Sequence, residues 1–373
     1  MRAVITAGGT AGHINPALAI AGEIIRNEPS SDLVFVGRKD GMERRLVTEV
    51  GYKLHEIEVH GFMRRVSFEN VLFNIKSVFS AMAAQKEAKG FLKSFDPDVV
   101  IGCGGYVSGP VVKAAASMGY DTVIHEQNAL PGMTTKLLAR RAALILCADE
   151  ECVERLGFPG KSTVTGNPVR RAFFEADRED LREKLNVGEK VFVLSFGGSN
   201  GAAGIDRAAV AFMAKHQKTE KVFHVHATGK HAAAAFPALM REYGIDKENK
   251  NIRICEYIND MPEHFAACDL VISRAGALTV SELMASGRAS VLVPSPNVTG
   301  NHQFYNAMSL AKAGAAFIYD EKDVETEGFA EKLMELISDP EYLKKMGECA
   351  GRMAKPDSAE HIYRCVRELL DNG

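Results

Sequence analysis

One pattern occurs twice in this chain and constrains its fold: a short apolar strand, a loop rich in glycine and the start of a helix. The first copy has the strand Val4–Thr6 and the loop Gly8–His13, and the second has the strand Lys190–Phe196 and the loop Gly197–Ala202. After each copy, apolar strands alternate with helical stretches, which is typical of a parallel sheet covered by helices on both faces. The chain is therefore predicted to be α/β, with two doubly wound, Rossmann-like domains.

The length of 373 residues suits two such domains. Glycine, asparagine and proline cluster at 166–170, and we expect the join between the domains there. In open parallel sheets, ligands bind beyond the carboxyl ends of the strands, so the loops that follow strands are the place to look for function. Besides the two opening strands, strands are predicted at residues 33–36, 99–101, 122–124, 143–146, 222–225, 252–255, 270–272, 290–293 and 316–318.

Composition argues against several classes of protein. The formal net charge of −3 does not indicate a nucleic-acid-binding protein. The seven cysteines are irregularly spaced and include no CxxC pair, so they predict reduced thiols of a cytosol, not a disulfide framework or a zinc ribbon. No apolar stretch reaches the roughly 18 residues of a transmembrane helix, and the first residues lack the apolar core of a signal peptide. We expect any contact with a membrane to be made from its surface.

The two glycine loops are candidate sites for an anion such as a diphosphate. Glycine lets backbone N–H groups approach an anion, and the start of a helix favours negative charge. The spacing is not G-x-G-x-x-G, and the second strand ends in Gly37-Arg38 where an NAD enzyme carries an acidic residue. Arg38 leaves an NADP enzyme as an alternative. One such loop also occurs as a plain turn, but two at matching places favour a ligand.

Polar side chains at the strand ends of the first half are candidates for chemistry. His13, at a helix start, is suited to act as general base on a hydroxyl near neutral pH, although a single histidine is as often structural. The residues 125–128 (His-Glu-Gln-Asn) follow one strand, and 104–106 (Gly-Gly-Tyr) follow another. Four hydrogen-bonding side chains in a row are costly to bury unpaired. They indicate either a polar substrate or an internal network.

Three features of the second half have both a functional and a structural interpretation. Thr279 and Glu282 have the spacing of a capping box, but the Glu282 carboxylate could equally bind the hydroxyls of a ribose. The loop 297–303 could bind sugar hydroxyls or only water. His224 and His226 share one face of a strand, which permits a metal site, but no acidic or thiol partner is spaced to complete it.

The segment 62–93 combines an apolar stripe with basic residues. It carries six basic and two acidic residues, a net charge of +4. This combination suits the surface of an anionic membrane, and the alternative is an ordinary core-facing helix. The stripe at helical spacing consists of Phe68, Val71, Leu72, Ile75, Phe79 and Met82.

Six motifs in the loops carry a family resemblance over essentially the whole chain. They are GGTAGHINPALA at 8–19, GGYVSGP at 104–110, HEQN at 125–128, GNPVR at 166–170, GGSNGA at 197–202 and RAGALTVSE at 274–282. In this order and spacing the chain resembles the MurG family, the UDP-N-acetylglucosamine–N-acetylmuramyl-(pentapeptide) pyrophosphoryl-undecaprenol N-acetylglucosaminyltransferases. Three departures affect single contacts: Ala11 replaces a glycine, Asn200 replaces a glutamine, and 301–303 lacks paired glutamines.

The resemblance implies a GT-B fold, in which two Rossmann-like domains face a cleft and the C-terminal helix returns to the first domain. The acceptor domain, which faces the membrane, would comprise residues 1–166 and 352–373, and the donor domain residues 167–351. The donor would be UDP-N-acetylglucosamine. By motif match, its binding residues would be Thr10, Ala11, Gly12, Asn128, Arg170, Ser199, Ile258, Ala277, Leu278, Thr279, Val280, Ser281, Glu282 and Gln303.

The resemblance also implies the reaction: inverting transfer to the 4-hydroxyl of lipid I, a muramoyl-pentapeptide on undecaprenyl diphosphate, giving lipid II for peptidoglycan. His13 and Glu126 would be catalytic. The acceptor would be bound by Gly9, Gly104, Gly105 and Tyr106. A membrane patch, on the cytoplasmic side of the cell membrane and facing anionic lipids, would consist of Phe68, Leu72, Ile75, Phe79 and Met82. No metal, no other cofactor and no nucleic acid is expected.

Three alternatives stay open at this point. The first is a GT-B transferase that acts on another membrane lipid, because the segment 62–93 does not distinguish between lipid acceptors. The second is an NADP-dependent oxidoreductase with two nucleotide folds. The third is a module that binds a nucleotide sugar without catalysis.

Overall fold

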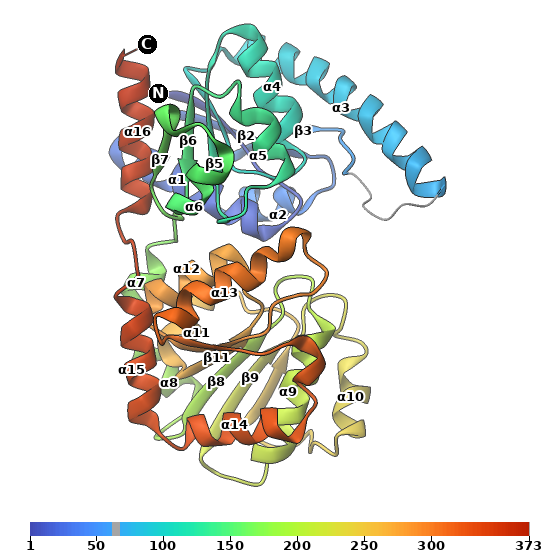
Figure 1. The fold of residues 1–373 in the computed structure, drawn as a ribbon, viewed down its shortest axis with the longest axis vertical. Coiled ribbons are helices and arrows are strands. Elements are labelled where there is room, and N and C mark those ends of the chain that lie inside the picture. Colours follow the sequence, from blue (N-terminus) through green and yellow to red (C-terminus); the bar gives the residue numbers. More distant parts are fainter. Residues whose placement is uncertain (62–67, 373) are drawn as a thin grey trace. The chain divides into compact units, whose positions relative to one another are not determined.

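A computed structural model describes residues 1–61 and 68–372, without the side chains at 68–72, 74, 75 and 299. The chain forms two compact units (Figure 1). Unit 1 comprises Met1–Arg170 and Asp357–Gly373, and unit 2 comprises Arg171–Pro356. The division after Arg170 lies at the end of the motif at 166–170.

Unit 1 is built on a seven-stranded parallel sheet with the strand order β3-β2-β1-β4-β5-β6-β7. Its strands are β1 (Arg2–Thr6), β2 (Asp32–Arg38), β3 (Lys53–Ile57), β4 (Val99–Gly102), β5 (Asp121–Glu126), β6 (Leu144–Cys147) and β7 (Ser162–Val164). Its helices are α1 (Ala11–Asn27), α2 (Met42–Glu49), α3 (Phe68–Phe95), α4 (Ser108–Met118), α5 (Met133–Ala139), α6 (Glu150–Leu156), the short 3-10 helix η1 (Pro159–Lys161) and α16 (Ser358–Asn372).

The last helix of the chain, α16, belongs to unit 1. It packs against α1, with Ile362 and Val366 buried in the core that lies on one face of the sheet. Leu369 and Leu370 pack at the edge of the same core. This face explains why α16 is amphipathic. A second core on the other face lies beneath α3, α4 and α5.

Unit 2 has a six-stranded parallel sheet in the order β10-β9-β8-β11-β12-β13. Its strands are β8 (Val191–Phe196), β9 (Val222–Ala227), β10 (Ile252–Cys255), β11 (Leu270–Ser273), β12 (Ala289–Leu292) and β13 (Ala316–Ile318). Its helices are α7 (Ala172–Glu175), α8 (Arg178–Leu185), α9 (Ala203–His216), α10 (Phe236–Glu242), α11 (Met261–Ala267), α12 (Ala277–Ser286), η2 (Thr299–Asn301), α13 (His302–Lys312), η3 (Glu321–Asp323), α14 (Glu327–Ile337) and α15 (Pro340–Gly351).

The central strands of both sheets are apolar along their whole length because they are covered on both faces. β4, β11 and β12 are fully buried, and β1 and β8 are buried apart from their first residue. Continuous burial of this kind is the property of parallel sheets between two helical layers. The prediction of two doubly wound α/β domains is therefore confirmed.

Candidate functional site

The strand orders locate the ligand sites of the two sheets. Each sheet is wound outward in both directions from a central pair, β1 with β4 in unit 1 and β8 with β11 in unit 2. Ligands of such sheets bind beyond the carboxyl ends of the strands at this reversal point. The loops there are those with Gly8 and Gly104 in unit 1 and those with Gly197 and Gly276 in unit 2. The glycine loops thus lie where the fold places a ligand.

The two glycine loops of unit 1 lie against each other. Gly105 has a φ of +81°, and a Cβ there would lie 2.1 Å from the Gly8 carbonyl oxygen. Gly9 has a φ of +84°, and a Cβ there would lie 3.0 Å from the ring of Tyr106. The Tyr106 hydroxyl accepts a hydrogen bond from the Arg38 guanidinium at 3.2 Å. Glycine is required because the backbones meet without space for side chains.

A buried carboxylate lies beneath the first glycine loop. Glu43, in the first turn of α2, is only 1% exposed, and its Oε1 accepts a hydrogen bond from the Gly9 N–H at 2.9 Å. A Cβ at Gly8 or Gly41 would lie 2.0 or 1.9 Å from this carboxylate. The Gly9 N–H is therefore engaged by the protein itself. The sequence reasoning did not single out Glu43, because it is distant from the loop in the chain.

The histidine at the start of α1 has a defined proton arrangement. Gln127, which is buried, donates its amide N–H to the Cys103 carbonyl at 2.9 Å, so its Oε1 must be the acceptor toward His13. His13 Nδ1 lies 3.1 Å from this oxygen and therefore carries the hydrogen. In the neutral imidazole with this tautomer, Nε2 is the nitrogen without a hydrogen, which is the arrangement a general base needs. Gln127 belongs to the motif at 125–128, but the sequence alone did not predict it as a site residue.

The neighbouring Glu126 is satisfied by four hydrogen bonds within unit 1. Its Oε1 accepts from the backbone and side-chain amides of Asn128 at 3.1 and 3.0 Å. Its Oε2 accepts from the Gly132 N–H at 2.9 Å and from the Thr135 hydroxyl. The carboxylate therefore connects the end of β5 to the start of α5. This arrangement favours a positioning role for Glu126 over the catalytic role that the resemblance implies.

Unit 2 has a polar cavity of about 370 Å³ at the carboxyl ends of β8 and β11. Gly201 in its wall has a φ of +82°, and a Cβ there would lie 2.1 Å from the Thr228 carbonyl oxygen. Gln303, predicted to bind the donor, lines the cavity and accepts from the Ser295 N–H at 2.8 Å. The lining residues are Gly197, Gly201, Ala202, Ala203, Gly204, Arg274, Ser295, Asn297, Val298, Gln303 and Glu321.

Two of these lining residues form an ion pair. Arg274 donates to the carbonyls of Val293 and Pro294 at 3.0 and 3.3 Å and to the Glu321 carboxylate. Glu321 also accepts from Arg207 of α9 at 3.2 Å. The carboxylate is thus balanced by two guanidinium groups and does not oppose an anionic ligand. Arg274 belongs to the motif at 274–282, but neither residue was predicted from the sequence as part of a site.

The helix α12 carries six of the predicted donor residues. It begins at Ala277 with Gly276 as its N-cap, so Thr279 lies inside the helix and the capping-box interpretation of Glu282 is wrong. Leu278 and Val280 are buried among core residues, so they can offer a ligand only backbone groups. Glu282 is nearly buried, and Ala277, Thr279 and Ser281 are half-buried.

Other predicted residues are distributed over both units. Thr10 and Gly12 are exposed at the start of α1, with Ala11 half-buried between them. Arg170 is the last residue of the first segment of unit 1. Ser199 lies in the loop after β8, and Ile258 is buried in the segment after β10.

The imidazoles of the histidine pair of β9 are hydrogen-bonded to other side chains and are not arranged as ligands of a metal ion. The Ser195 hydroxyl lies 2.7 Å from His224 Nε2 and 2.8 Å from His226 Nδ1. His226 Nε2 lies 3.1 Å from the Asp206 carboxylate, and His224 Nδ1 lies 3.0 Å from His216 Nε2. Among the described residues, no three histidine, cysteine, aspartate or glutamate side chains are grouped to hold a metal ion.

Burial of these imidazoles predicts acid sensitivity. Desolvation lowers the pKa of His216 to about 4 from its ordinary 6.5, so the unfolded chain binds a proton at higher pH than the folded chain does. The contribution of His216 to the free energy of unfolding is therefore fully present above pH 6.5. It decreases by about 3 kcal/mol as the pH falls toward 4. The measurement is thermal unfolding at pH 7 and pH 5. In His216→Gln, which keeps an N–H donor that does not titrate, we expect a smaller decrease; an equal decrease would contradict the assignment.

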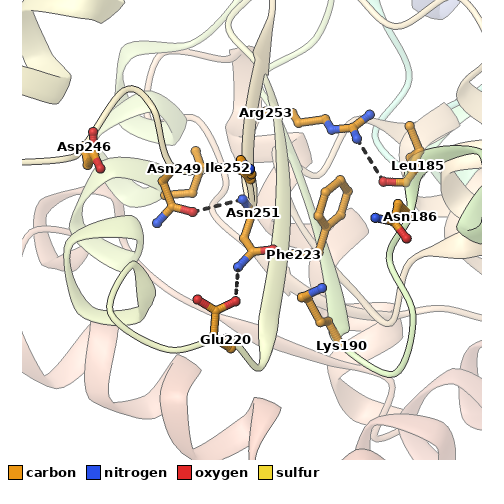
Figure 2. Close-up of a pocket in the computed structure, with 11 residues that line it drawn as sticks. Leu185, Asn186, Lys190, Glu220, Phe223, Asp246, Asn249, Asn251, Ile252 and Arg253 are labelled. Atoms are coloured by element: carbon orange, nitrogen blue, oxygen red, sulfur yellow. Dashed lines mark hydrogen bonds between the residues drawn. The ribbon is translucent and has the colours of Figure 1, made fainter.

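Another cavity lies at the other end of the unit 2 sheet (Figure 2). It measures about 830 Å³ and is lined by residues that precede β8, β9 and β10 and by the first residues of β9 and β10. Two of its polar side chains are paired within the wall: Asn251 donates to Glu220 at 3.0 Å and Arg253 to the Leu185 carbonyl at 2.9 Å. It lies at the amino ends of the strands, where open parallel sheets do not bind their ligands, and we do not assign the site to it.

Comparisons with known proteins identify the family of this chain. Residues 3–147 match the model of the glycosyltransferase family 28 N-terminal domain, and residues 192–362 match that of the family 28 C-terminal domain. The UDP-N-acetylglucosamine–N-acetylmuramyl-(pentapeptide) pyrophosphoryl-undecaprenol N-acetylglucosamine transferase of Thermoanaerobacter sp. (strain X514) is 40% identical over 370 residues, 99% of this chain and 100% of that protein. The chain belongs to the MurG family, within glycosyltransferase family 28.

Other MurG relatives extend this result. The enzyme of the same name from Acetivibrio thermocellus is 38% identical over 373 residues, which is 100% of this chain and 99% of that protein. The crystal structure of Acinetobacter baumannii MurG is 27% identical with a TM-score of 0.72, and the match covers 98% of this chain and 99% of that one. The resemblance, the glycosyltransferase activity and the GT-B fold expected of the MurG family are therefore confirmed.

Proposed function

We propose that the chain transfers N-acetylglucosamine from UDP-N-acetylglucosamine to the muramoyl 4-hydroxyl of the undecaprenyl-diphosphate-linked precursor of peptidoglycan. The observation that carries this proposal is the identity of 40% over 370 residues to an enzyme named for that reaction. The motifs of the family also occupy the ligand-binding ends of both sheets.

The proton arrangement of His13 supports a direct displacement mechanism. Its Nε2 lone pair takes the proton of the acceptor hydroxyl, because Nδ1–H is donated to Gln127. The hydroxyl oxygen forms a bond to the anomeric carbon, while the bond from that carbon to the diphosphate breaks and UDP leaves. Attack from the face opposite the leaving group inverts the anomeric centre and gives a β-1,4 link.

The unit 2 cavity supports binding of the donor diphosphate. Its wall includes the loop after β8 and the start of α9, where backbone N–H groups and the helix dipole favour an anion. Ser199 in this loop would contact the diphosphate, and the amide of Gln303 would contact the sugar. We propose that these groups balance the leaving charge without a metal ion.

A transfer assay tests the function and separates it from the alternatives. Radiolabelled UDP-N-acetylglucosamine is offered with a short-chain analogue of lipid I in one sample and with diacylglycerol in another. We expect a labelled product with the lipid I analogue only. Product with diacylglycerol alone would indicate another lipid acceptor, and UDP binding without any product would indicate a binding module. Oxidation of NADPH added to a third sample, without transfer, would indicate an oxidoreductase.

We further propose that unit 1 binds the cytoplasmic face of the membrane through α3 and α5. Of the helices that the structure describes, none is long and apolar enough to span a bilayer. Phe79 and Met82 of α3 are 67% and 63% exposed; the side chains of Phe68, Leu72 and Ile75 lie outside the described residues. Met133 and Leu137 of α5 are 72% and 78% exposed.

The charges around these side chains support an anionic lipid surface as partner. Lys76 and Lys86 of α3, Lys136 of α5 and Arg140 directly after α5 are all exposed. Both helices pack against α4 (Figure 1). Exposed apolar side chains with neighbouring cations gain both burial and attraction at anionic headgroups.

Charging the α3 patch should reduce membrane binding. In Phe79→Asp with Met82→Asp we expect partition into vesicles with anionic lipid to decrease at least about tenfold, because two apolar side chains lose their burial. The measurement is co-sedimentation with vesicles. Tyr342→Asp, at a 42% exposed position of α15, is the matched control. Unchanged partition of the double variant would contradict the membrane patch and support the alternative that α3 is an ordinary core-facing helix.

A further inference from the structure

Five buried polar side chains of unit 2 form one hydrogen-bonded chain. They are Asp206 and His216 of α9, Ser195 of β8, and His224 and His226 of β9. Four contacts of 2.7–3.1 Å join them in the order Asp206, His226, Ser195, His224, His216. The proposed chemistry uses none of these residues, so their purpose needs a separate explanation.

The hydrogen positions follow from the ends of this chain. An ionised Asp206 can only accept, so His226 donates its Nε2–H; in neutral His226 the Nδ1 lone pair then accepts the Ser195 O–H. The Ser195 oxygen then accepts from His224 Nε2–H, and His224 Nδ1 accepts from His216 Nε2–H. With neutral imidazoles, each group of the chain donates one hydrogen bond to the next, from His216 toward Asp206, and all four contacts are hydrogen bonds. Such a satisfied network holds its elements in a single arrangement.

The Asp206 end of the chain lies at the glycine loop 197–202. Asp206 is in the first turn of α9, and its backbone N–H bonds the Ala202 carbonyl at 3.0 Å. On the other side, Gly201 lies against the Thr228 carbonyl, two residues beyond His226. Lys230 N–H also donates to the Ser199 carbonyl at 3.2 Å. The loop is thus held between α9 and the end of β9, which the Asp206–His226 contact joins directly.

We propose that Asp206 and His226 are positioning residues that hold the glycine loop 197–202 in the conformation that binds the donor diphosphate. This inference rests on the proposed function, which places the diphosphate at that loop. His216, at the last turn of α9, ends the same chain away from the loop. Substitutions at the two ends of the network should therefore have different effects on UDP binding, since only the Asp206 end adjoins the loop.

The test compares variants at the two ends by UDP titration calorimetry. Asp206→Ala removes the acceptor of His226, and we expect UDP affinity to decrease about tenfold, the effect of about one lost hydrogen bond to a charged group. In steady-state transfer its donor KM rises while kcat stays constant. Asp206→Asn keeps an acceptor oxygen and should restore the affinity. His216→Phe should lower the melting temperature without changing UDP affinity.

The possible outcomes separate a failure of the positioning role from a failure of the proposed function. Absence of UDP binding by the unmodified protein would contradict the proposed function itself. UDP binding by the unmodified protein and equally by Asp206→Ala would overturn the positioning role and leave the function intact. Equal weakening in Asp206→Ala and His216→Phe would also overturn it, because the network would then act only through the stability of unit 2.

Discussion

Replacing His13 with alanine should lower kcat by about 100- to 10,000-fold, the range that a positioned general base contributes. The structure gives the reason: Gln127 holds the Nδ1–H of His13, which leaves Nε2 as the proton acceptor. UDP affinity should decrease much less, because the proposed role of His13 is to take the proton of the acceptor hydroxyl and not to bind UDP. The measurement is steady-state transfer kinetics beside calorimetric titration with UDP.

A second variant tests the orientation of the imidazole. Gln127→Leu removes the acceptor of the Nδ1–H, so the base loses its fixed tautomer while the imidazole remains. We expect a decrease in kcat smaller than that of His13→Ala, with the folded state checked by thermal unfolding. Equal losses of turnover and UDP affinity in His13→Ala would contradict the role of His13 as base.

Gly201→Ala should abolish most donor binding. The added Cβ would lie 2.1 Å from the Thr228 carbonyl oxygen, and the φ of +82° is unfavourable for alanine. Because the obstacle is backbone, the loop 197–202 must move, and its contacts with the donor diphosphate are lost together. We expect UDP affinity to decrease by at least about 100-fold, which corresponds to about two hydrogen bonds to a charged group.

Gly188→Ala is the matched control for this variant. Gly188 also lies in unit 2 with a positive φ of +60°, but a Cβ there meets open space. Gly188→Ala therefore measures the effect of a positive φ at alanine without a steric clash of the added Cβ. UDP affinity that is normal in Gly188→Ala and strongly reduced in Gly201→Ala supports the assignment of the loop. Similar UDP affinities in both variants would contradict the assignment of the diphosphate site to the loop 197–202.

The fold was predictable from the sequence because its central strands are buried on both faces. β3 and β7 were missed, since both are edge strands with half-buried residues and no continuous apolar run. Their neighbours β2 and β6 are buried almost throughout and therefore produced a clear signal. The missed strands do not change the position of the glycine loops, which lie at the centres of the sheets.

The candidate site was predictable only where it is local in the chain. Glycine loops and polar residues directly after a strand are visible in a sequence, as at 8–13 and 125–128. Glu43 contacts Gly9 across 34 positions, and Glu321 contacts Arg274 across 47. These partners come from other elements, so no spacing rule connects them. The histidine pair of β9 was visible, but the Ser195, Asp206 and His216 that explain it were not.

The measurement that tests the central claim most directly is transfer of radiolabelled N-acetylglucosamine to a short-chain lipid I analogue, once with EDTA and once with magnesium ions. The claim is that the side chains and helix starts of this chain perform an inverting transfer themselves. It predicts equal rates in both samples and a β-linked product by NMR. Product that forms only without EDTA, or an α-linked product, would contradict it.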